Sequence, residues 1–290
     1  MTDRLDAEVK TIARTFRGVL GVSAVDLSGG ASREVVAVNA DLRFPTASTI
    51  KTAVMIEAYH QAAEGRLTFE TPLTLHKADV VGGSGVLRDL HDGLTLTVGD
   101  AVQLMIGLSD NTATNLLIGK LGTASVNARL DTYGLTGTRL FRPTFRDGRA
   151  DVLPELEREF GLGMTTPREM AKLMALIGSG RALNAEASRA MLATLRRQQD
   201  RAMIPRLLTA EGVEVGNKTG TDEEKQPGRG GVKGQVRADA AIVTGPNGLC
   251  YSLAIYARQI EDSRWTIEND ALTTGARISK MIYDGLRAGR

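Results

Sequence analysis

The sequence contains a single cysteine and only three histidines among its 290 residues. With Cys250 alone no internal disulfide can form, and its apolar surroundings in the sequence predict a small buried hydrophobic side chain. His60, His76 and His91 are too widely spaced to form a recognisable zinc-binding pattern. The sequence therefore predicts neither a disulfide framework nor a metal site, and no cofactor is expected.

The sequence also has no large excess of positive or negative charge, and it has no long hydrophobic run. The formal net charge is +2, and the Lys and Arg residues are scattered. Binding to nucleic acid or to an anionic membrane uses a concentrated basic patch, so neither partner is expected. No apolar run approaches the roughly 20 residues that cross a bilayer, so no membrane insertion is expected either. Residues 1–8 lack the apolar centre of a secretory signal, which predicts a cytoplasmic protein if Met1 is the native start.

What the chain does have is length for a substantial core, with strand patterns at both ends and helical patterns between them. The strand-like runs are residues 18–27, 34–39, 213–221, 240–244 and 250–258. Helical patterns cover residues 5–16, most of 44–198, and 267–286. We therefore predict a mixed α/β (α+β) fold: residues 1–43 and 199–290 form a sheet subdomain, and residues 44–198 form an inserted helical subdomain. The active site is expected in the cleft between them, and the protein is expected to be a monomer.

A serine and a lysine three residues apart stand at the start of the first long helical pattern. Pro45 and Thr46 are helix-start residues, and the pattern runs to Gly65. In a helix, Ser48 and Lys51 would share one face, with Cβ atoms about 5–6 Å apart. The lysine could then accept the serine proton if burial or neighbouring cations lowered its pKa. Alone, the pair could equally be a capping hydroxyl and a solvated amine.

Two further polar motifs follow. Ser109-Asp110-Asn111 interrupts a helical region, and Lys218-Thr219-Gly220-Thr221 ends a strand-like segment. Gly220 would allow the backbone to approach a ligand closely. Taken singly, the first motif could be a helix cap and the second a turn. Together, Ser-x-x-Lys, Ser-Asp-Asn and Lys-Thr-Gly in this order are the signature of class A β-lactamases and penicillin-binding proteins.

The chain resembles the class A β-lactamase family of serine hydrolases over nearly its whole length. Besides the three motifs, the resemblance includes Phe44-Pro45, Asn115-Leu116-Leu117 and Thr165-Thr166-Pro167. It implies the β-lactamase/transpeptidase-like fold, with a five-stranded antiparallel sheet built from both termini and flanked by helices. It also implies a β-lactam or an acyl-D-Ala-type substrate. Because the family is usually exported, the resemblance leaves the cellular location open.

The resemblance assigns catalytic roles to three side chains. Ser48 attacks the lactam carbonyl, and Lys51 accepts or relays its proton. Ser109 passes a proton to the departing lactam nitrogen. The backbone N–H groups of Ser48 and Thr221 form the oxyanion hole.

It assigns substrate binding to a second group of residues. Asn111 binds the side-chain amide of the substrate, while Lys218 and Thr219 hold its carboxylate. Thr221 belongs to the substrate-binding residues through its N–H in the oxyanion hole. Arg237, at the start of a strand, stands where the family often places a second carboxylate-binding cation. The alternative for Arg237 is a solvated arginine at a strand edge.

The sequence departs from the family in the segment before Pro167. Class A enzymes carry there a glutamate, in an Arg-x-Glu context, that orients the water for hydrolysis of the acyl-enzyme. Arg142 best matches that arginine, which puts Thr144 at the position of the glutamate. Five acidic residues follow: Asp147, Asp151, Glu155, Glu157 and Glu159. Glu155 is a candidate substitute base, although runs of charge usually face water, which favours solvated charges at all five positions.

The acylation residues are therefore all present, whereas no deacylating residue is identifiable. The expected function is a serine β-lactamase-type hydrolase that opens the β-lactam amide through an acyl-enzyme on Ser48. The alternatives are a penicillin-binding DD-peptidase or an esterase of the same fold, or a non-hydrolytic sensor of β-lactams or peptidoglycan fragments. The glycine-rich loop at residues 82–87 is expected to line one rim of the cleft.

Overall fold

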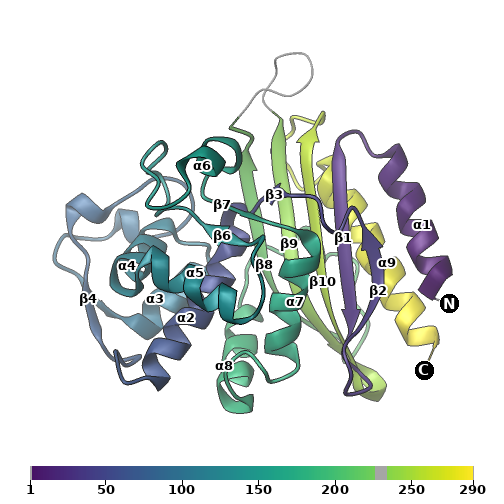
Figure 1. Ribbon diagram of the computed structural model, residues 1–290, viewed down its shortest axis with the longest axis horizontal. Helices are drawn as coiled ribbons and strands as arrows, with labels where there is room; N and C mark the ends of the chain where they lie inside the picture. The colour runs from purple at the N-terminus through teal and green to yellow at the C-terminus, as the bar shows by residue number, and fades with distance from the viewer. Residues whose placement is uncertain (1, 226–233, 290) are drawn as a thin grey trace.

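A five-stranded antiparallel sheet organises the computed structural model, which describes residues 2–225 and 234–289 (Figure 1). Its strand order is β2-β1-β10-β9-β8. The strands are β1 (Val19–Asp26), β2 (Arg33–Val38), β8 (Glu214–Glu223), β9 (Gln235–Gly245) and β10 (Leu249–Ile260). Since β1 pairs with β10, the two ends of the chain meet in the middle of one sheet.

The terminal helices cover one face of this sheet. They are α1 (Thr2–Thr15) and α9 (Asp270–Ala288), which lie side by side (Figure 1). Their apolar residues, such as Val9 and Ile278, are fully buried against alternate side chains of the strands, such as Val22 and Ala241. The two helices cover this face of the sheet completely enough to form a core, and the three sequence motifs lie elsewhere in the molecule.

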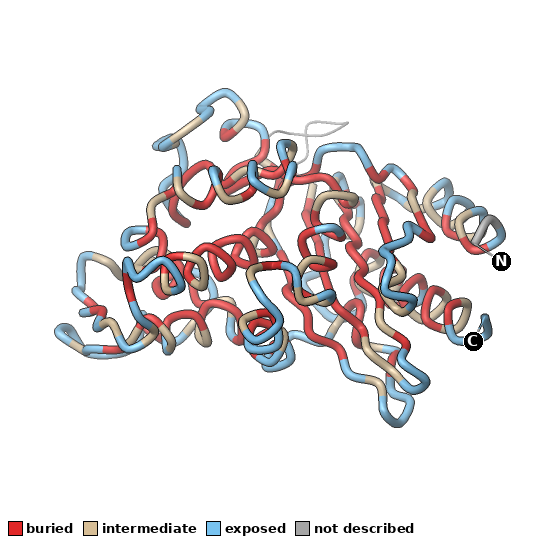
Figure 2. The backbone as a smooth tube through the Cα atoms, turned by 60° about the horizontal axis from the view of Figure 1, so that its bottom comes forward, coloured by how far each residue is buried: buried red, intermediate tan, exposed pale blue. Residues whose placement is uncertain are grey.

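The remaining helices belong to the middle part of the chain, and some of them pack on the opposite face of the sheet. They are α2 (Lys51–Ala63), α3 (Val98–Gly107), α4 (Asn111–Leu121), α5 (Thr123–Thr132), α6 (Pro154–Phe160), α7 (Pro167–Gly178) and α8 (Ala185–Leu195). Short strands connect them: β3 (Phe44–Pro45), β6 (Arg139–Leu140) and β7 (Gly163–Thr165) form one small sheet, while β4 (Pro72–Thr74) pairs with β5 (Thr95–Thr97). The α2 helix is buried on nearly all sides at residues 51–58, so it forms the centre of this part (Figure 2).

The predicted α+β fold with its five-stranded antiparallel sheet is confirmed. The family resemblance of Thr165-Thr166-Pro167 implies that a helix opens there, and α7 does begin at Pro167, where Thr166 caps it by accepting a hydrogen bond from the Glu169 N–H. Two local predictions are wrong. Ser48 lies in a short 3₁₀ turn, Ala47–Ile50, that precedes α2, and Lys218-Thr219-Gly220 lies inside β8 rather than at its end. Among the residues described, no helix is both long and apolar enough to cross a membrane.

Candidate active site

The three motifs meet at the hydroxyl of Ser109. The Lys51 Nζ donates hydrogen bonds to the Ser109 Oγ at 3.1 Å, the Ser109 carbonyl at 2.8 Å and the Asn111 Oδ1 at 2.8 Å. From the other side, the Lys218 Nζ donates to the same Ser109 Oγ at 3.0 Å. One hydroxyl oxygen is thus held between two amines that come from α2 and β8.

The connection between α3 and α4 holds Ser109 in an unusual conformation. Its φ of +56° is in the left-handed region, which costs energy for a residue other than glycine. Asp110 compensates as the N-cap of α4, because its carboxylate accepts hydrogen bonds from the N–H groups of Val86, Leu87 and Ala113. This one carboxylate fixes both the α4 terminus and the loop at residues 82–87, and so presents Ser109 toward Lys51.

Both lysines are completely buried. Burial lowers the pKa of Lys51 well below its usual value, the charge of Lys218 lowers it further, and Asp110 opposes the shift. Burial also lowers the pKa of Lys218, to about 8, against the opposing charges of Asp239 and Asp200. A lysine whose pKa is depressed in this way can act as a base near neutral pH, which an exposed lysine cannot.

Ser48 lines a cavity of about 210 Å³. The cavity is lined by Ser48, Ser84, Ser109, Thr219, Thr221 and the segments 107–108 and 198–200. The Ser48 turn sits directly against β8 because Gly220 has no side chain. A Cβ on Gly220 would lie 2.8 Å from the Thr46 carbonyl oxygen and 3.2 Å from the Ala47 Cβ. Gly220 therefore allows the nucleophile turn and the Lys218-Thr219 strand to approach each other.

Arg237 is neither solvated nor at a strand edge, so that alternative is wrong. It lies on β9, an interior strand, and is only 3% exposed. Its Nη2 donates to the Gln235 Oε1 at 2.6 Å, and the guanidinium carbon lies 4.4 Å from the centre of the Trp265 ring. Arg237 is the register partner of Thr221, which places it beside the cavity, although it is not among the residues that line it.

Thr144 is held firmly by a single side chain. The Asn115 Oδ1 accepts hydrogen bonds from the Thr144 N–H at 2.7 Å and from its hydroxyl at 3.0 Å, while the Asn115 Nδ2 donates to the Thr144 carbonyl at 3.1 Å. The Thr144 hydroxyl also reaches the Asn111 carbonyl at 3.4 Å. The position that the family resemblance gives to a glutamate is thus occupied by a short neutral side chain on a fixed backbone.

The acidic residues after Thr144 do not replace that glutamate in the cavity. The Glu155 side chain is 81% exposed and pairs with Arg158, so it faces away from the reacting groups. Glu157 is not solvated as expected; its carboxylate is buried and accepts a hydrogen bond from the Arg142 Nε at 2.7 Å. Arg142 also pairs with Asp147. These contacts give the segment a structural role in holding the loop that carries Thr144.

The sequence analysis missed the part of the cavity wall formed by the segments 107–108 and 198–200. Asp200 supplies the only carboxylate among the described residues that line the cavity. It follows α8 in a segment without a helical or strand pattern, and a lone aspartate in such a segment carries no signal. The loop at residues 82–87 was expected to line one rim of the cleft, and its Ser84 does line the cavity. In the same loop the Gly82 carbonyl accepts a hydrogen bond from the Asn111 Nδ2 at 3.1 Å.

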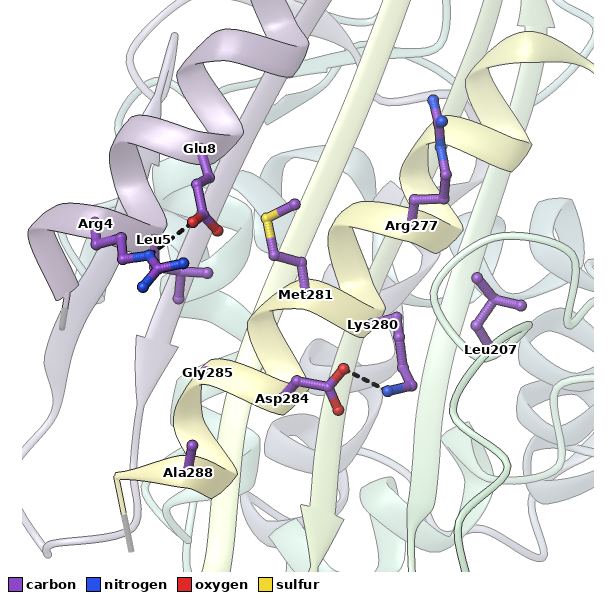
Figure 3. Close-up of a pocket in the computed structure, with 10 residues that line it drawn as sticks. All are labelled: Arg4, Leu5, Glu8, Leu207, Arg277, Lys280, Met281, Asp284, Gly285 and Ala288. Carbon is purple, nitrogen blue, oxygen red and sulfur yellow. Dashed lines mark hydrogen bonds and ion pairs between the residues drawn. The ribbon is translucent and has the colours of Figure 1, made fainter.

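A larger hollow, of about 590 Å³, lies on the outer face between α1 and α9 (Figure 3). Two ion pairs occupy its rim, Arg4 with Glu8 and Lys280 with Asp284. The described residues that line this hollow include none from the three motifs. Because the motif side chains are absent from the described lining of this hollow, the smaller cavity is the candidate active site.

Comparisons with known proteins agree with this geometry. The family model described as the Beta-lactamase enzyme family matches residues 4–286. Beta-lactamase CARB-3 of Pseudomonas aeruginosa is 25% identical over 284 residues, which cover 97% of this chain and 90% of that protein. The structure of a beta-lactamase from Sphaerobacter thermophilus DSM 20745 has a TM-score of 0.80 and 31% identity, covering 99% of this chain and 98% of that one.

A further solved relative is a PBP-A variant in an acyl-enzyme complex with penicillin G, with a TM-score of 0.79 and 27% identity. It covers 99% of this chain and 97% of its own. The family match extends over nearly the whole chain, and the structure brings together the three motifs on which the resemblance rested. The chain belongs to the Beta-lactamase enzyme family and is a class A β-lactamase-like serine hydrolase.

Proposed function

We propose that the chain opens the amide bond of β-lactams through an acyl-enzyme on Ser48. The observation that carries this proposal is the Ser109 hydroxyl held between the amines of Lys51 and Lys218, beside the cavity into which Ser48 opens. This arrangement supplies a nucleophile, a base of lowered pKa and a proton carrier within one small space. Penicillin G bound as an acyl-enzyme in the PBP-A relative shows the same kind of adduct in a protein of this fold.

In the first step the Ser48 oxygen attacks the lactam carbonyl, and its proton passes to the unprotonated Lys51. The oxygen of the tetrahedral intermediate would be bound by the backbone N–H groups of Ser48 and Thr221, at about 3–4 kcal/mol for each donor. When the C–N bond breaks, the lactam nitrogen takes the Ser109 proton, and Ser109 recovers a proton from Lys51 through their 3.1 Å hydrogen bond. The step leaves an ester on Ser48 and restores both other side chains.

The substrate carboxylate would lie at the Lys218–Thr219 end of the cavity. Thr219 and Thr221 line that end, and Lys218 contributes charge from beneath them. Arg237 would strengthen the positive potential from its buried position under Trp265 rather than contact the carboxylate. The Asn111 amide, held by Lys51 and by the Gly82 carbonyl, would bind the side-chain amide of the substrate.

Hydrolysis of the ester is expected to be the slow step. Thr144 has a hydroxyl where a carboxylate would activate water, and a hydroxyl is a far weaker base at neutral pH. Turnover should therefore be limited by deacylation, with the acyl-enzyme accumulating during the reaction.

The test is to mix the protein with a chromogenic cephalosporin and to follow colour and intact mass together. We expect an initial burst of about one equivalent, followed by slower multiple turnovers, with the adduct visible by mass. Ser48→Ala should abolish both the burst and the adduct. A single adduct that never turns over would contradict the hydrolase, and no adduct at all would contradict the nucleophile.

A further inference from the structure

Asp239 is a fully buried carboxylate directly behind the cavity. It lies on β9, and its register partner on β8 is Thr219. Its Oδ1 accepts a hydrogen bond from the Asn217 Nδ2 at 2.9 Å, and its Oδ2 accepts one from the Ile204 N–H at 2.9 Å. A buried carboxylate is costly unless it is well partnered, and neither of these two hydrogen-bond donors is a cation. None of the catalytic steps above uses this group.

The two hydrogen bonds connect the cavity wall to the catalytic strand. Asn217 immediately precedes Lys218 on β8, and its Nδ2 also donates to the Asp200 carbonyl at 3.3 Å. Asp239 itself holds the Ile204 N–H, four residues further along the same wall. The segment at residues 200–204 is therefore attached at one end to β8, through Asn217, and at the other end to β9, through Asp239, which is itself hydrogen-bonded to Asn217.

We infer that Asp239 is a positioning residue, which holds the wall at residues 200–204 against β8 and keeps Lys218 charged for the carboxylate of the substrate. The inference rests on the proposed function, because it concerns the same cavity. Asp239 lies behind Thr219 and does not line the cavity, so it would act only through its neighbours.

The charges around Asp239 give the direction of its effect. Burial raises the pKa of Asp239 to about 7, against the two hydrogen bonds and Lys218, and Asp200 raises it further. In return, ionised Asp239 raises the pKa of Lys218, the nearest buried cation. The other titratable groups that interact with it are the Arg201 guanidinium and the Tyr256 phenol. A neutral residue at 239 should therefore let Lys218 lose its proton at a lower pH.

The test compares Asp239→Asn with the wild type over about pH 6 to 9. Two substrates are used: a chromogenic cephalosporin with its free carboxylate, and the same molecule as the methyl ester. For the carboxylate substrate, the alkaline limb of the kcat/KM profile should move to lower pH, mainly through a several-fold rise in KM. The profile of the ester should keep its shape. A uniform loss at every pH for both substrates would reduce Asp239 to a structural role and overturn the inference.

Two further variants keep the test decisive. The double variant Asn217→Asp/Asp239→Asn swaps the amide and the carboxylate of this hydrogen-bonded pair. It should restore the alkaline limb of the kcat/KM profile. Glu214→Gln removes an exposed acid from β8, the strand that pairs with β9, and should leave the profile unchanged. If the wild type forms no acyl-enzyme, the proposed function fails separately. The pKa of Lys218, measured by NMR in the wild type and in Asp239→Asn, then decides the inference, and equal values would overturn it.

Discussion

At the scale of single residues, the chemistry depends on amines that are kept out of water. Lys51 is buried, donates three hydrogen bonds and has a pKa lowered first by burial and then by Lys218. A lysine on the surface at the same distance from a serine would be protonated and would not act as a base. The burial of α2 on nearly all sides is therefore a condition of the chemistry as well as of the fold.

Replacing Lys51 by methionine keeps the length and apolar volume of the side chain and removes the base. Acylation of Ser48 should slow by about 10²- to 10⁴-fold, the usual contribution of a positioned general base. Rapid-quench mass spectrometry of the adduct measures this rate, and circular dichroism checks that the variant is folded. Acylation at nearly the rate of the wild type would show that another group accepts the proton.

The raised pKa of Asp239 makes a prediction about stability. Its folded value of about 7 exceeds its usual unfolded value near 4, so the unfolded state gives up this proton first as the pH rises. The stability that protonated Asp239 contributes is complete below about pH 4 and is lost as the pH rises through 7. Urea unfolding should show a steeper loss between pH 4 and pH 8 in the wild type than in Asp239→Asn. Parallel curves would contradict the assignment.

At the scale of elements, the site depends on how closely β8 approaches the turn that carries Ser48. In this contact Gly220 of β8, which has no side chain, faces the backbone of Thr46. The helices on the other side are held at fixed points by their caps, Asp110 for α4 and Thr166 for α7. Small changes at these contacts should affect catalysis more than their distance from the substrate suggests.

Gly220→Ala tests this contact. The new Cβ would lie 2.8 Å from the Thr46 carbonyl, so β8 or the turn must move, at a cost of about 1–3 kcal/mol. Acylation should fall sharply along with the stability. The matched control is Gly119→Ala in α4, where a Cβ meets nothing within 4 Å and the helix should gain stability. Equal behaviour of the two variants in thermal unfolding would refute the role of Gly220.

Thr144, in the loop before α6, is a site where faster hydrolysis of the acyl-enzyme could be introduced by substitution. Because Asn115 fixes the backbone on both sides of the Thr144 side chain, Thr144→Glu should present a carboxylate without rebuilding the loop. We expect a shorter acyl-enzyme lifetime with little change in the acylation rate, measured by the decay of the adduct mass. Thr144→Gln, which has the same size without the basic group, should leave the lifetime long. A shorter lifetime in both variants would point to loosening of the loop instead.

Much of this arrangement could be predicted from the sequence, because the motifs are local and their order along the chain is specific. The five strands followed from the apolar patterns of their segments, whereas the start of α7 followed from the family resemblance of Thr165-Thr166-Pro167. Ser48 in a 3₁₀ turn could not be predicted, since the turn begins at Ala47 with a left-handed φ of +42° and packs against Gly220 of the distant strand β8. Asp200, Asp239 and the burial of Arg237 depend on contacts between distant segments, which have no local signature.

At the scale of the whole molecule, the sheet draws strands from both ends of the chain and places the catalytic strand β8 at its margin. The helices pack on its two faces, and the three motifs meet where the helical part borders β8 (Figure 1). The division into residues 1–43 with 199–290 and residues 44–198, like the monomeric state, stays a prediction. With the site at this border, rigid packing of both parts is needed to keep Ser48, Ser109 and Lys218 in register.

The neighbouring terminal helices have one more consequence. Leu5 of α1 packs against Gly285 of α9, so the beginning and the end of the described chain are adjacent in space. A short peptide could join them, and a cut at the β9–β10 turn, residues 246–248, would create new ends at the surface. Such a circular permutant would carry β10 and α9 ahead of α1, yet the three motifs would keep their order and would still meet around the same hydroxyl.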